Sequence, residues 1–117
     1  MKRKFRLIKS TDFKRVRRLG KPYAHPFLVL IKLPNNLIKT RVGVSAGRSI
    51  GNAVRRNKAK RKIREIIRTL LPEIQPGWDI IILARKPILT ANQQEIKSAM
   101  NGTLLRSDLF RNNNTEE

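Results

Sequence analysis

The stretch "RVGVSAGRSIGNAVRRNKAKRKIREIIR", residues 41–68, decides how the chain is expected to fold. Its first part alternates apolar and polar side chains, as a half-buried strand does. Its second part repeats apolar residues at helical spacing, which predicts a helix from about Asn52 to Leu71 that ends before Pro72. Ser49 and Asn52 are both candidate caps for this helix. A strand that leads directly into a long basic helix is therefore the centre of the predicted fold.

The predicted helix has two contrasting faces. Between Gly51 and Arg68 the chain carries eight Lys or Arg residues and a single acidic one. Neighbouring like charges three or four residues apart cost a few tenths of a kcal/mol per pair in an isolated helix. A face that repeats this cost is expected to be neutralised by phosphates rather than to be a solvated charged surface. At about 100° per residue, the apolar stripe consists of Ala59, Ile63, Ile66, Ile67 and Leu70, and the basic face of Asn57, Lys60, Arg61, Arg64 and Arg68.

The composition also favours an anionic partner. The 117 residues carry a formal net charge of +19, and no residue is cysteine, which excludes disulfides and thiolate metal sites. A domain this basic is expected to bind a polyanion, with nucleic acid as the first candidate and an anionic membrane as the second. No apolar run approaches the ~20 residues that span a bilayer, and the N-terminus lacks the apolar core of a signal peptide, so a cytoplasmic protein is expected. We predict one nucleic-acid-binding domain over residues 1–110 and a frayed polar tail over 111–117.

The flanking segments predict the remaining elements. A short amphipathic helix is expected to begin with Ser10 as its cap, and Pro22 and Pro26 are expected to bracket a connector. Residues 27–45 are expected to form a β-hairpin. Trp78–Ala84 is a continuous apolar run typical of a central strand, and Thr90 has the capping-box spacing that starts a last helix. The order α-β-β-(short β)-α-β-α predicts a two-layer α+β sandwich with one central sheet.

No active site formed by protein side chains is visible. His25, the only histidine, lies between two prolines without an acid or a nucleophile beside it, so we interpret it as a loop residue. The eight acidic residues are scattered, whereas a two-metal nuclease site needs several convergent carboxylates. Nothing resembles the glycine-rich loop that holds nucleotide phosphates. We therefore expect no catalytic residue and no metal ligand in this chain.

Two further clusters each allow two interpretations. The segment Gly43–Gly51, with Ser45, Arg48 and Ser49, either holds an anion at the start of the basic helix or is an ordinary loop. Phe13 and one face of the first predicted strand either line a groove where single-stranded bases stack or belong to the core, and composition favours the core. That face carries Phe27, Val29 and Ile31.

The quoted stretch resembles the signature of the bacterial ribonuclease P protein subunit, an R-N-R-x-K-R-x-x-R pattern that follows G-N-A-V. The pattern here is Arg56-Asn57-Lys58-Ala59-Lys60-Arg61-Lys62-Ile63-Arg64. Two flanks extend the resemblance over roughly residues 6–108. "RLIKSTDFKRVRRLG" is similar to the family's R-L-x-x-x-x-D-F-x-x-V-x-x-x-G, and "GWDIIILARKPI" is similar to its strand that ends in A-R.

The resemblance implies a sandwich with a left-handed β-α-β crossover, of a kind also found in a ribosomal protein domain. It further implies a division of labour, in which a catalytic RNA performs Mg²⁺-dependent removal of the 5′ leader from precursor tRNA. The protein binds the leader in a cleft between its first helix and the sheet, and its basic helix docks on the RNA subunit, with one protein per RNA. A ribosomal protein that binds ribosomal RNA is the alternative.

The resemblance also implies two sets of site residues. Residues expected to contact the catalytic RNA are Arg55, Arg56, Asn57, Lys60, Arg61, Arg64 and Arg68. Residues expected to line the leader cleft are Phe13, Val16, Arg17, Phe27 and Ile31, with Ser45, Arg48, Arg85 and Lys86 as nearby phosphate contacts. Lys58 stands where the motif has its second arginine, which keeps the charge but loses the bidentate fork. Arg17 and Ile31 stand where the family often has aromatic residues, so leader binding is expected to depend more on charge and guanidinium stacking.

Overall fold

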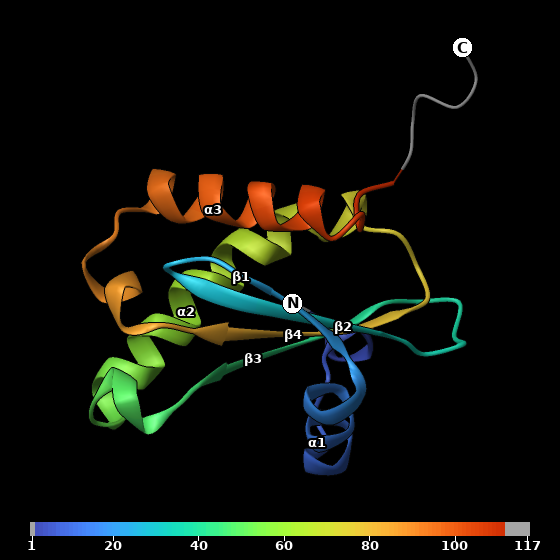
Figure 1. Cartoon of the computed structure of the whole chain (residues 1–117), viewed down its shortest axis with the longest axis horizontal. Coiled ribbons are helices and arrows are strands. Elements are labelled where there is room, and N and C mark those ends of the chain that lie inside the picture. The colour runs from blue at the N-terminus through green and yellow to red at the C-terminus, as the bar shows by residue number, and fades with distance from the viewer. Residues whose placement is uncertain (1, 112–117) are drawn as a thin grey trace.

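A four-stranded sheet with the strand order β1-β2-β4-β3 forms the centre of the molecule (Figure 1). The computed structural model describes residues 2–111. Its main elements are α1 (Ser10–Leu19), β1 (Lys21–Ala24), β2 (Leu28–Pro34), β3 (Arg41–Ala46), α2 (Ala53–Leu70), β4 (Trp78–Ala84) and α3 (Gln93–Arg106). Short 3-10 turns occupy Arg3–Phe5, Arg48–Ile50, Leu71–Glu73 and Lys86–Thr90. The predicted α+β class and the long helix after β3 are confirmed.

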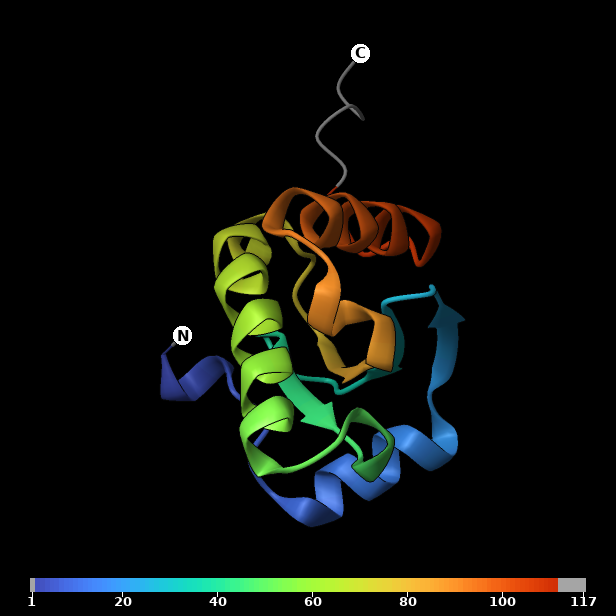
Figure 2. The same ribbon diagram turned by 90° about the vertical axis from the view of Figure 1, so that its left-hand side faces the viewer.

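β4 lies inside the sheet because it is apolar on both faces. Ile80 and Ile82 point into one hydrophobic core and Ile81 into the other. β4 pairs antiparallel with β2 and parallel with β3, and α2 makes the connection from β3 to β4. In Figure 2, where β3 and β4 run toward the viewer, the chain passes from β3 through α2 to β4 in a clockwise sense. The crossover is therefore left-handed, a connection that parallel strands rarely use.

The predicted β-hairpin over residues 27–45 is wrong. β2 and β3 both lie in that range, but β4 is inserted between them. A strand that is apolar on both faces is best buried with a neighbour on each side, and this non-local pairing overrides the local turn signal. The hairpin partner of β2 is instead β1, in the segment predicted to be a connector. β1 is an edge strand, where Pro22 is tolerated because its missing N–H is not needed for the ladder.

The sheet separates two hydrophobic cores. α2 and α3 cover one face, and α1 lies across the other (Figures 1 and 2). The predicted apolar stripe of α2 faces the larger core, with four of its five residues buried and Leu70 half-buried. The smaller core beneath α1 consists of Leu7, Val16, Ile31 and Ile81. Since α1 is only 10 residues long, it covers only part of its sheet face.

The helix caps differ in part from the predicted ones. Asn52, one of the two candidates, caps α2 by accepting a hydrogen bond from the Arg55 backbone N–H at 3.0 Å. Ser10 is the first residue of α1 rather than its cap. Thr90 does not start the capping box of α3, which is formed by Asn92 and Glu95 two residues later. Capping-box spacing occurs at both positions, and Thr90 is already held within the preceding turn.

The two ends of the described chain are anchored on the sheet and on the turn that follows α2. Arg6 forms a bridge with Val42, and Leu7 N–H donates to the Val42 carbonyl at 2.9 Å, which covers the open edge of β3. Arg111, the first residue of the predicted tail, donates from Nε to the Pro72 carbonyl at 3.0 Å. The rest of that predicted tail lies outside the described residues. No helix within residues 2–111 is both long enough and apolar enough to span a bilayer.

Candidate nucleic-acid interface

The outward face of α2 carries the predicted RNA contacts. Its buried stripe fixes the rotation of the helix, so the residues on the opposite side point to solvent. Arg55, Asn57, Arg61, Arg64 and Arg68 are exposed, and Arg56 and Lys60 are half-buried. All the ion pairs found within residues 2–111 involve Asp12 or Asp79, which lie on α1 and β4. These predicted RNA-contact cations of α2 therefore have no intramolecular counterion in that part of the chain.

The local sequence explains how α2 starts. Gly51 adopts φ +132°, a backbone conformation that side chains with a Cβ rarely take, and Asn52 then caps the first turn. Arg56 donates from Nη1 to the Gly51 carbonyl at 2.7 Å. This bond uses only one of its guanidinium N–H groups, so others remain for a phosphate. Gly51 and Asn52 thus fix where α2 starts and how its first turn is oriented.

Lys62 has a different role from the other cations of α2. Its Nζ donates to the carbonyls of Ile88 at 3.3 Å, Leu89 at 3.1 Å and Ala91 at 2.9 Å. Burial, and then the neighbouring charge of Lys58, lowers the pKa of Lys62. Lys62 therefore ties α2 to the turn that follows β4, and its ammonium group stabilises the fold by binding backbone carbonyls.

α1 is held on the sheet by a buried carboxylate that sequence reasoning missed. Asp79 is fully buried and accepts hydrogen bonds from Arg41 Nε at 2.9 Å, Arg41 Nη2 at 2.7 Å, Arg15 Nη2 at 2.7 Å and Asn35 Nδ2 at 2.9 Å. Burial by itself raises the pKa of Asp79, but these hydrogen bonds outweigh it and hold the pKa below its usual value. The available signal was a single acid inside an apolar strand, since such a group needs a partner.

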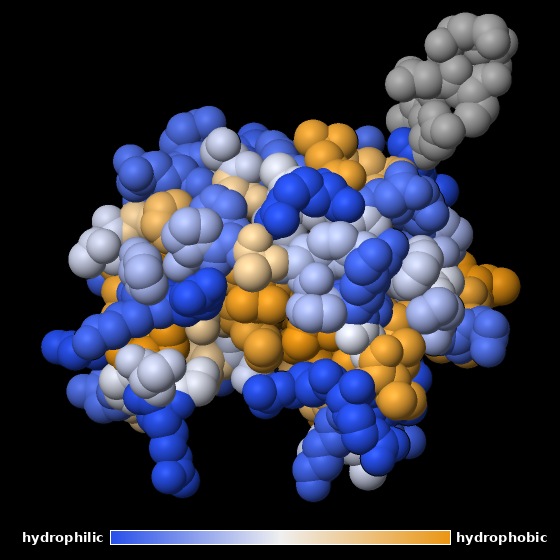
Figure 3. Space-filling model, viewed as in Figure 1, coloured by the Kyte–Doolittle hydropathy of each residue, from blue (hydrophilic) through white to orange (hydrophobic). Residues whose placement is uncertain are grey.

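A partly open strip of two apolar side chains and one serine lies beside α1. The strand register aligns Val29 of β2, Leu83 of β4 and Ser45 of β3 in one row across the sheet. All three are half-buried, and Val29 and Leu83 pack against the same small core as Phe13. We call these three residues the sheet strip. Figure 3 shows hydrophilic side chains over most of one face of the molecule, with apolar surface visible between them.

Phe13 lies directly above Gly43 of β3. A Cβ on Gly43 would collide with the ring of Phe13, so glycine allows the ring to approach the strand. Phe13 also lines a hollow of about 200 Å³ together with Arg64 of α2. The two predicted surfaces, which the sequence places on separate elements, therefore meet at the edge of β3.

The structure divides the residues expected in the leader cleft. Phe13 is half-buried and Arg17 is exposed on α1, whereas Val16 and Ile31 are buried beneath them and support the wall from inside. The placement of Phe27 on the same face as Ile31 is wrong, because Phe27 packs against the larger core on the opposite side of the sheet. β2 begins only at Leu28, so the alternation of faces does not extend back to Phe27.

The expected phosphate contacts also lie in different places. Arg48, Arg85 and Lys86 are exposed, and Ser45 belongs to the sheet strip. Lys86 lines a hollow together with Arg55 and Lys58, so it lies beside the start of α2 rather than beside α1.

His25 occupies the turn between β1 and β2. Its Nδ1 accepts a hydrogen bond from Phe27 N–H at 3.0 Å, and burial together with the charge of Arg106 lowers its pKa. This agrees with its interpretation as a loop residue.

Over residues 2–111 the structure contains no group of three His, Asp or Glu side chains arranged to hold a metal ion.

Comparisons with known proteins agree with these features. A family model described as Ribonuclease P matches residues 1–108. The ribonuclease P protein component of Herpetosiphon aurantiacus is 38% identical over 110 residues, which cover 94% of this chain and 89% of that protein. The solved structure of the Staphylococcus aureus ribonuclease P protein has a TM-score of 0.81 at 31% identity, covering 92% of this chain and 98% of its own. The Thermotoga maritima protein has a TM-score of 0.77 at 30% identity, covering 86% and 96%. With its basic helix, left-handed crossover and matching length, this chain belongs to the ribonuclease P protein family.

Proposed function

We propose that this protein is the protein subunit of ribonuclease P and assists the endonucleolytic removal of the 5′ leader from precursor tRNA. The observation that carries the proposal is the outward face of α2, whose cations have no counterion among residues 2–111 and follow the family's G-N-A-V sequence. The RNA subunit performs the hydrolysis, and the Mg²⁺ that the holoenzyme requires supplies the electrophilic chemistry there. The contribution of this chain is to bind and orient RNA, in the cytoplasm and as one copy per RNA subunit.

The catalytic RNA binds to α2 in this proposal. Arg61, Arg64 and Arg68 project on successive turns and can contact successive phosphates, and Arg55 and Lys60 extend the same face. If roughly five phosphates are neutralised, the logarithm of the binding constant should fall with the logarithm of salt concentration with a slope of about −3.5 to −4.5.

The 5′ leader binds along α1 and the sheet strip. Phe13 offers a half-buried aromatic ring, Arg17 offers an exposed guanidinium, and Val29 and Leu83 offer apolar surface on which unpaired bases can lie. Asp79 of β4 supports this site indirectly, because its ion pair with Arg15 ties α1 to the sheet and its ion pair with Arg41 ties β3 to β4.

Reconstitution tests the function. The purified protein is added to a bacterial ribonuclease P RNA and precursor tRNA at low Mg²⁺ concentration, and 5′ cleavage is measured. We expect stimulation of cleavage by the wild-type protein and a marked loss of stimulation with Arg61→Ala plus Arg64→Ala. A charge-matched control, Lys21→Ala plus Lys97→Ala, removes two exposed cations from β1 and α3 and should remain active. No stimulation by the wild-type protein would overturn the proposal.

The alternative, a structural binder of ribosomal RNA, is not favoured. The family match covers residues 1–108 and the relatives are ribonuclease P protein components, whereas the ribosomal interpretation rests on charge and sandwich topology alone. Equal affinity for ribosomal RNA fragments and for ribonuclease P RNA, measured at the same salt concentration, would restore it.

A further inference from the structure

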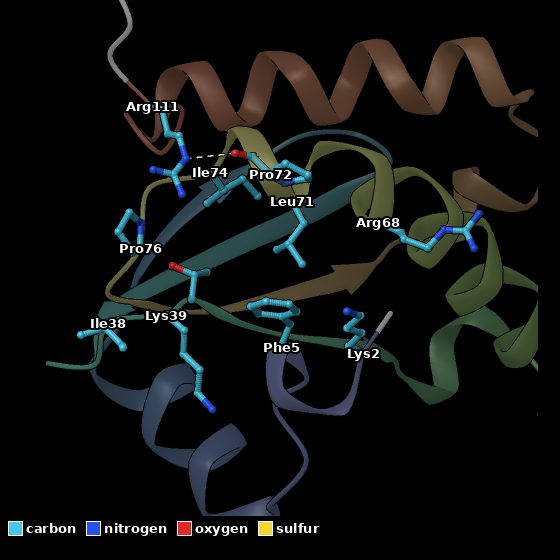
Figure 4. A pocket seen from close by; sticks show the side chains of 11 residues that line it. Lys2, Phe5, Ile38, Lys39, Arg68, Leu71, Pro72, Ile74, Pro76 and Arg111 are labelled. Atoms are coloured by element: carbon cyan, nitrogen blue, oxygen red, sulfur yellow. Dashed lines mark hydrogen bonds between the residues drawn. The ribbon is translucent and has the colours of Figure 1, made fainter.

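A second candidate binding site lies at the C-terminal end of α2 (Figure 4). It is a pocket of about 550 Å³, which we call the end pocket. One wall is formed by the end of α2 and the turn that follows it, and the other by the Arg3–Phe5 turn and the loop before β3. Leu71 and Phe5 extend toward one another from these opposite walls (Figure 4). A pocket of this size is large enough for a small planar ligand.

The end pocket combines apolar walls with a cationic rim. Of the residues from 2 to 111, six apolar ones line it, among them Phe5, Ile38 and Leu71, and no acidic one does. Its charged lining consists of Lys2, Lys39, Arg68 and Arg111. None of these four takes part in an ion pair within residues 2–111. Such a site complements a ligand with a flat apolar part and a negative charge, as a nucleotide has.

The apolar part of the end pocket is unusually exposed. Ile38 is 98% exposed and Phe5 is only half-buried. The ring of Phe5 already has the Lys4 ammonium group 5.0 Å from its centroid, so cationic groups and an aromatic face lie together. A second copy of this chain is a poor occupant, because each copy carries a net charge of +19. An RNA nucleotide satisfies both the charge and the apolar surface.

Arg68 connects the end pocket to the proposed docking face. It belongs to the basic face of α2 and also lines the end pocket. An RNA strand that follows α2 toward its C-terminal end therefore reaches the rim of the end pocket without leaving the cationic surface. The separate leader site on α1 does not include any of the residues that line the end pocket.

We propose that the end pocket binds one unpaired nucleotide of the RNA subunit, with its base between Phe5 and Leu71 and its phosphates at Lys2, Lys39 and Arg68. This proposal rests on the proposed function, since it names a further contact in the same ribonucleoprotein. The base is recognised by stacking and by shape, while the cations neutralise the backbone on either side.

Photocrosslinking in the assembled holoenzyme tests the location. Ile38 is replaced by p-benzoylphenylalanine, a change that its exposure should make harmless to folding, and Leu105, 67% exposed on α3, is replaced in a control protein. After irradiation with ribonuclease P RNA, we expect the Ile38 variant to crosslink to one unpaired nucleotide and the Leu105 variant to give no such product. Crosslinks from position 38 only to base-paired RNA, to protein, or to nothing would overturn the proposal.

Binding measurements test the two halves of the end pocket separately. Phe5→Ala should weaken RNA binding by about fivefold to tenfold, at the lower end of the range for one stacked base because only one wall is aromatic. It should leave the salt slope unchanged, whereas Lys39→Ala should reduce the slope by about 0.7 to 0.9. Ile38→Ser is a second variant that removes an apolar side chain of the end pocket, and it leaves the Arg3–Phe5 turn unchanged. Thermal unfolding confirms that each variant is folded. Unchanged affinity in both apolar variants would refute base binding.

The design separates this proposal from the function on which it rests. If the wild-type protein fails to bind ribonuclease P RNA, or if Arg61→Ala plus Arg64→Ala binds it normally, the proposed function fails. If the wild-type protein binds and that double variant is defective, but position 38 gives no crosslink to an unpaired nucleotide, only the end-pocket proposal fails.

Discussion

Replacing Asp79 by asparagine should loosen α1 while leaving α2 intact. The substitution keeps the size of the side chain but removes the charge that pairs with Arg15 and Arg41. Breaking a buried ion pair costs ~3–5 kcal/mol because a charge is left without its partner. Here the side chain of Arg15 is 36% exposed and that of Arg41 is 24% exposed. Water can therefore solvate both guanidinium groups and compensate for part of the lost ion-pair energy. We expect the free energy of unfolding to fall by about 2–3 kcal/mol.

The assay is urea denaturation of the wild-type and Asp79→Asn proteins at neutral and acidic pH. The pKa of Asp79 is lower in the folded protein than in the unfolded chain, so its contribution is complete above the unfolded pKa and is lost as the pH falls through the folded value. The difference between the two proteins should therefore be constant near neutrality and should shrink below about pH 4. A difference that stays the same in acid would refute the assignment of the stabilisation to the carboxylate charge.

Asp12→Asn is the matched control for this experiment. Asp12 lies on α1 near the same arginines but at longer range, 3.5 Å from Arg15 and 3.7 Å from Arg41, and it is partly exposed. Such a pair contributes ~0–1 kcal/mol, so the Asp12 variant should be close to wild type. If both substitutions destabilised the protein equally, general loss of negative charge rather than the buried network would be the cause.

In the holoenzyme, Asp79→Asn should weaken leader binding more than it weakens binding of the RNA subunit.

Two other predictions concern RNA binding, and a third concerns the stability of the fold. Arg61→Ala plus Arg64→Ala should flatten the salt slope of RNA-subunit binding by about two units, one for each lost phosphate contact, as titrations at several salt concentrations will show. Phe13→Ala should reduce the affinity for precursor tRNA but not for mature tRNA, measured with the assembled holoenzyme; equal losses would mean that Phe13 does not contact the leader. Lys62→Ala should destabilise the fold by ~1.5–3 kcal/mol in urea denaturation because its ammonium group holds backbone carbonyls, whereas the exposed Lys58→Ala should not.

Local periodicity was sufficient to predict the elements that form the two sides of the larger core. The stripe of α2 repeats at helical spacing and Trp78–Ala84 is apolar on both faces, and these patterns depend only on which side of an element is buried. Gly51 and Asn52 could likewise be interpreted locally, because a turn followed by a cap is encoded in neighbouring residues. The family motif added the direction of the crossover, which no periodicity encodes.

Non-local contacts were beyond the reach of the sequence. β1 contains a proline, which marks it as a connector unless its edge position in the sheet is known. The turn signal between β2 and β3 predicted a hairpin. In the structure β4 lies between these two strands, because both faces of β4 are apolar and must be buried. Asp79 finds its partners 64 and 38 residues away along the chain, at Arg15 and Arg41, so only the folded arrangement shows that it is paired. The end pocket could not be predicted for the same reason, because it is lined by residues from both ends of the described chain together with the end of α2.

The geometry at the edge of β3 has a consequence for how the two proposed RNA sites work together. Phe13 of α1 and Arg64 of α2 line one hollow, and the ring of Phe13 approaches the strand so closely only because residue 43 is glycine. If α2 binds the RNA subunit as proposed, that RNA lies next to the surface proposed for the leader, at the edge of β3. Changes at Arg64 should consequently disturb both sites, since residues that share a cavity can couple energetically. Arg61, one turn away from that hollow, is the cleaner probe of docking alone.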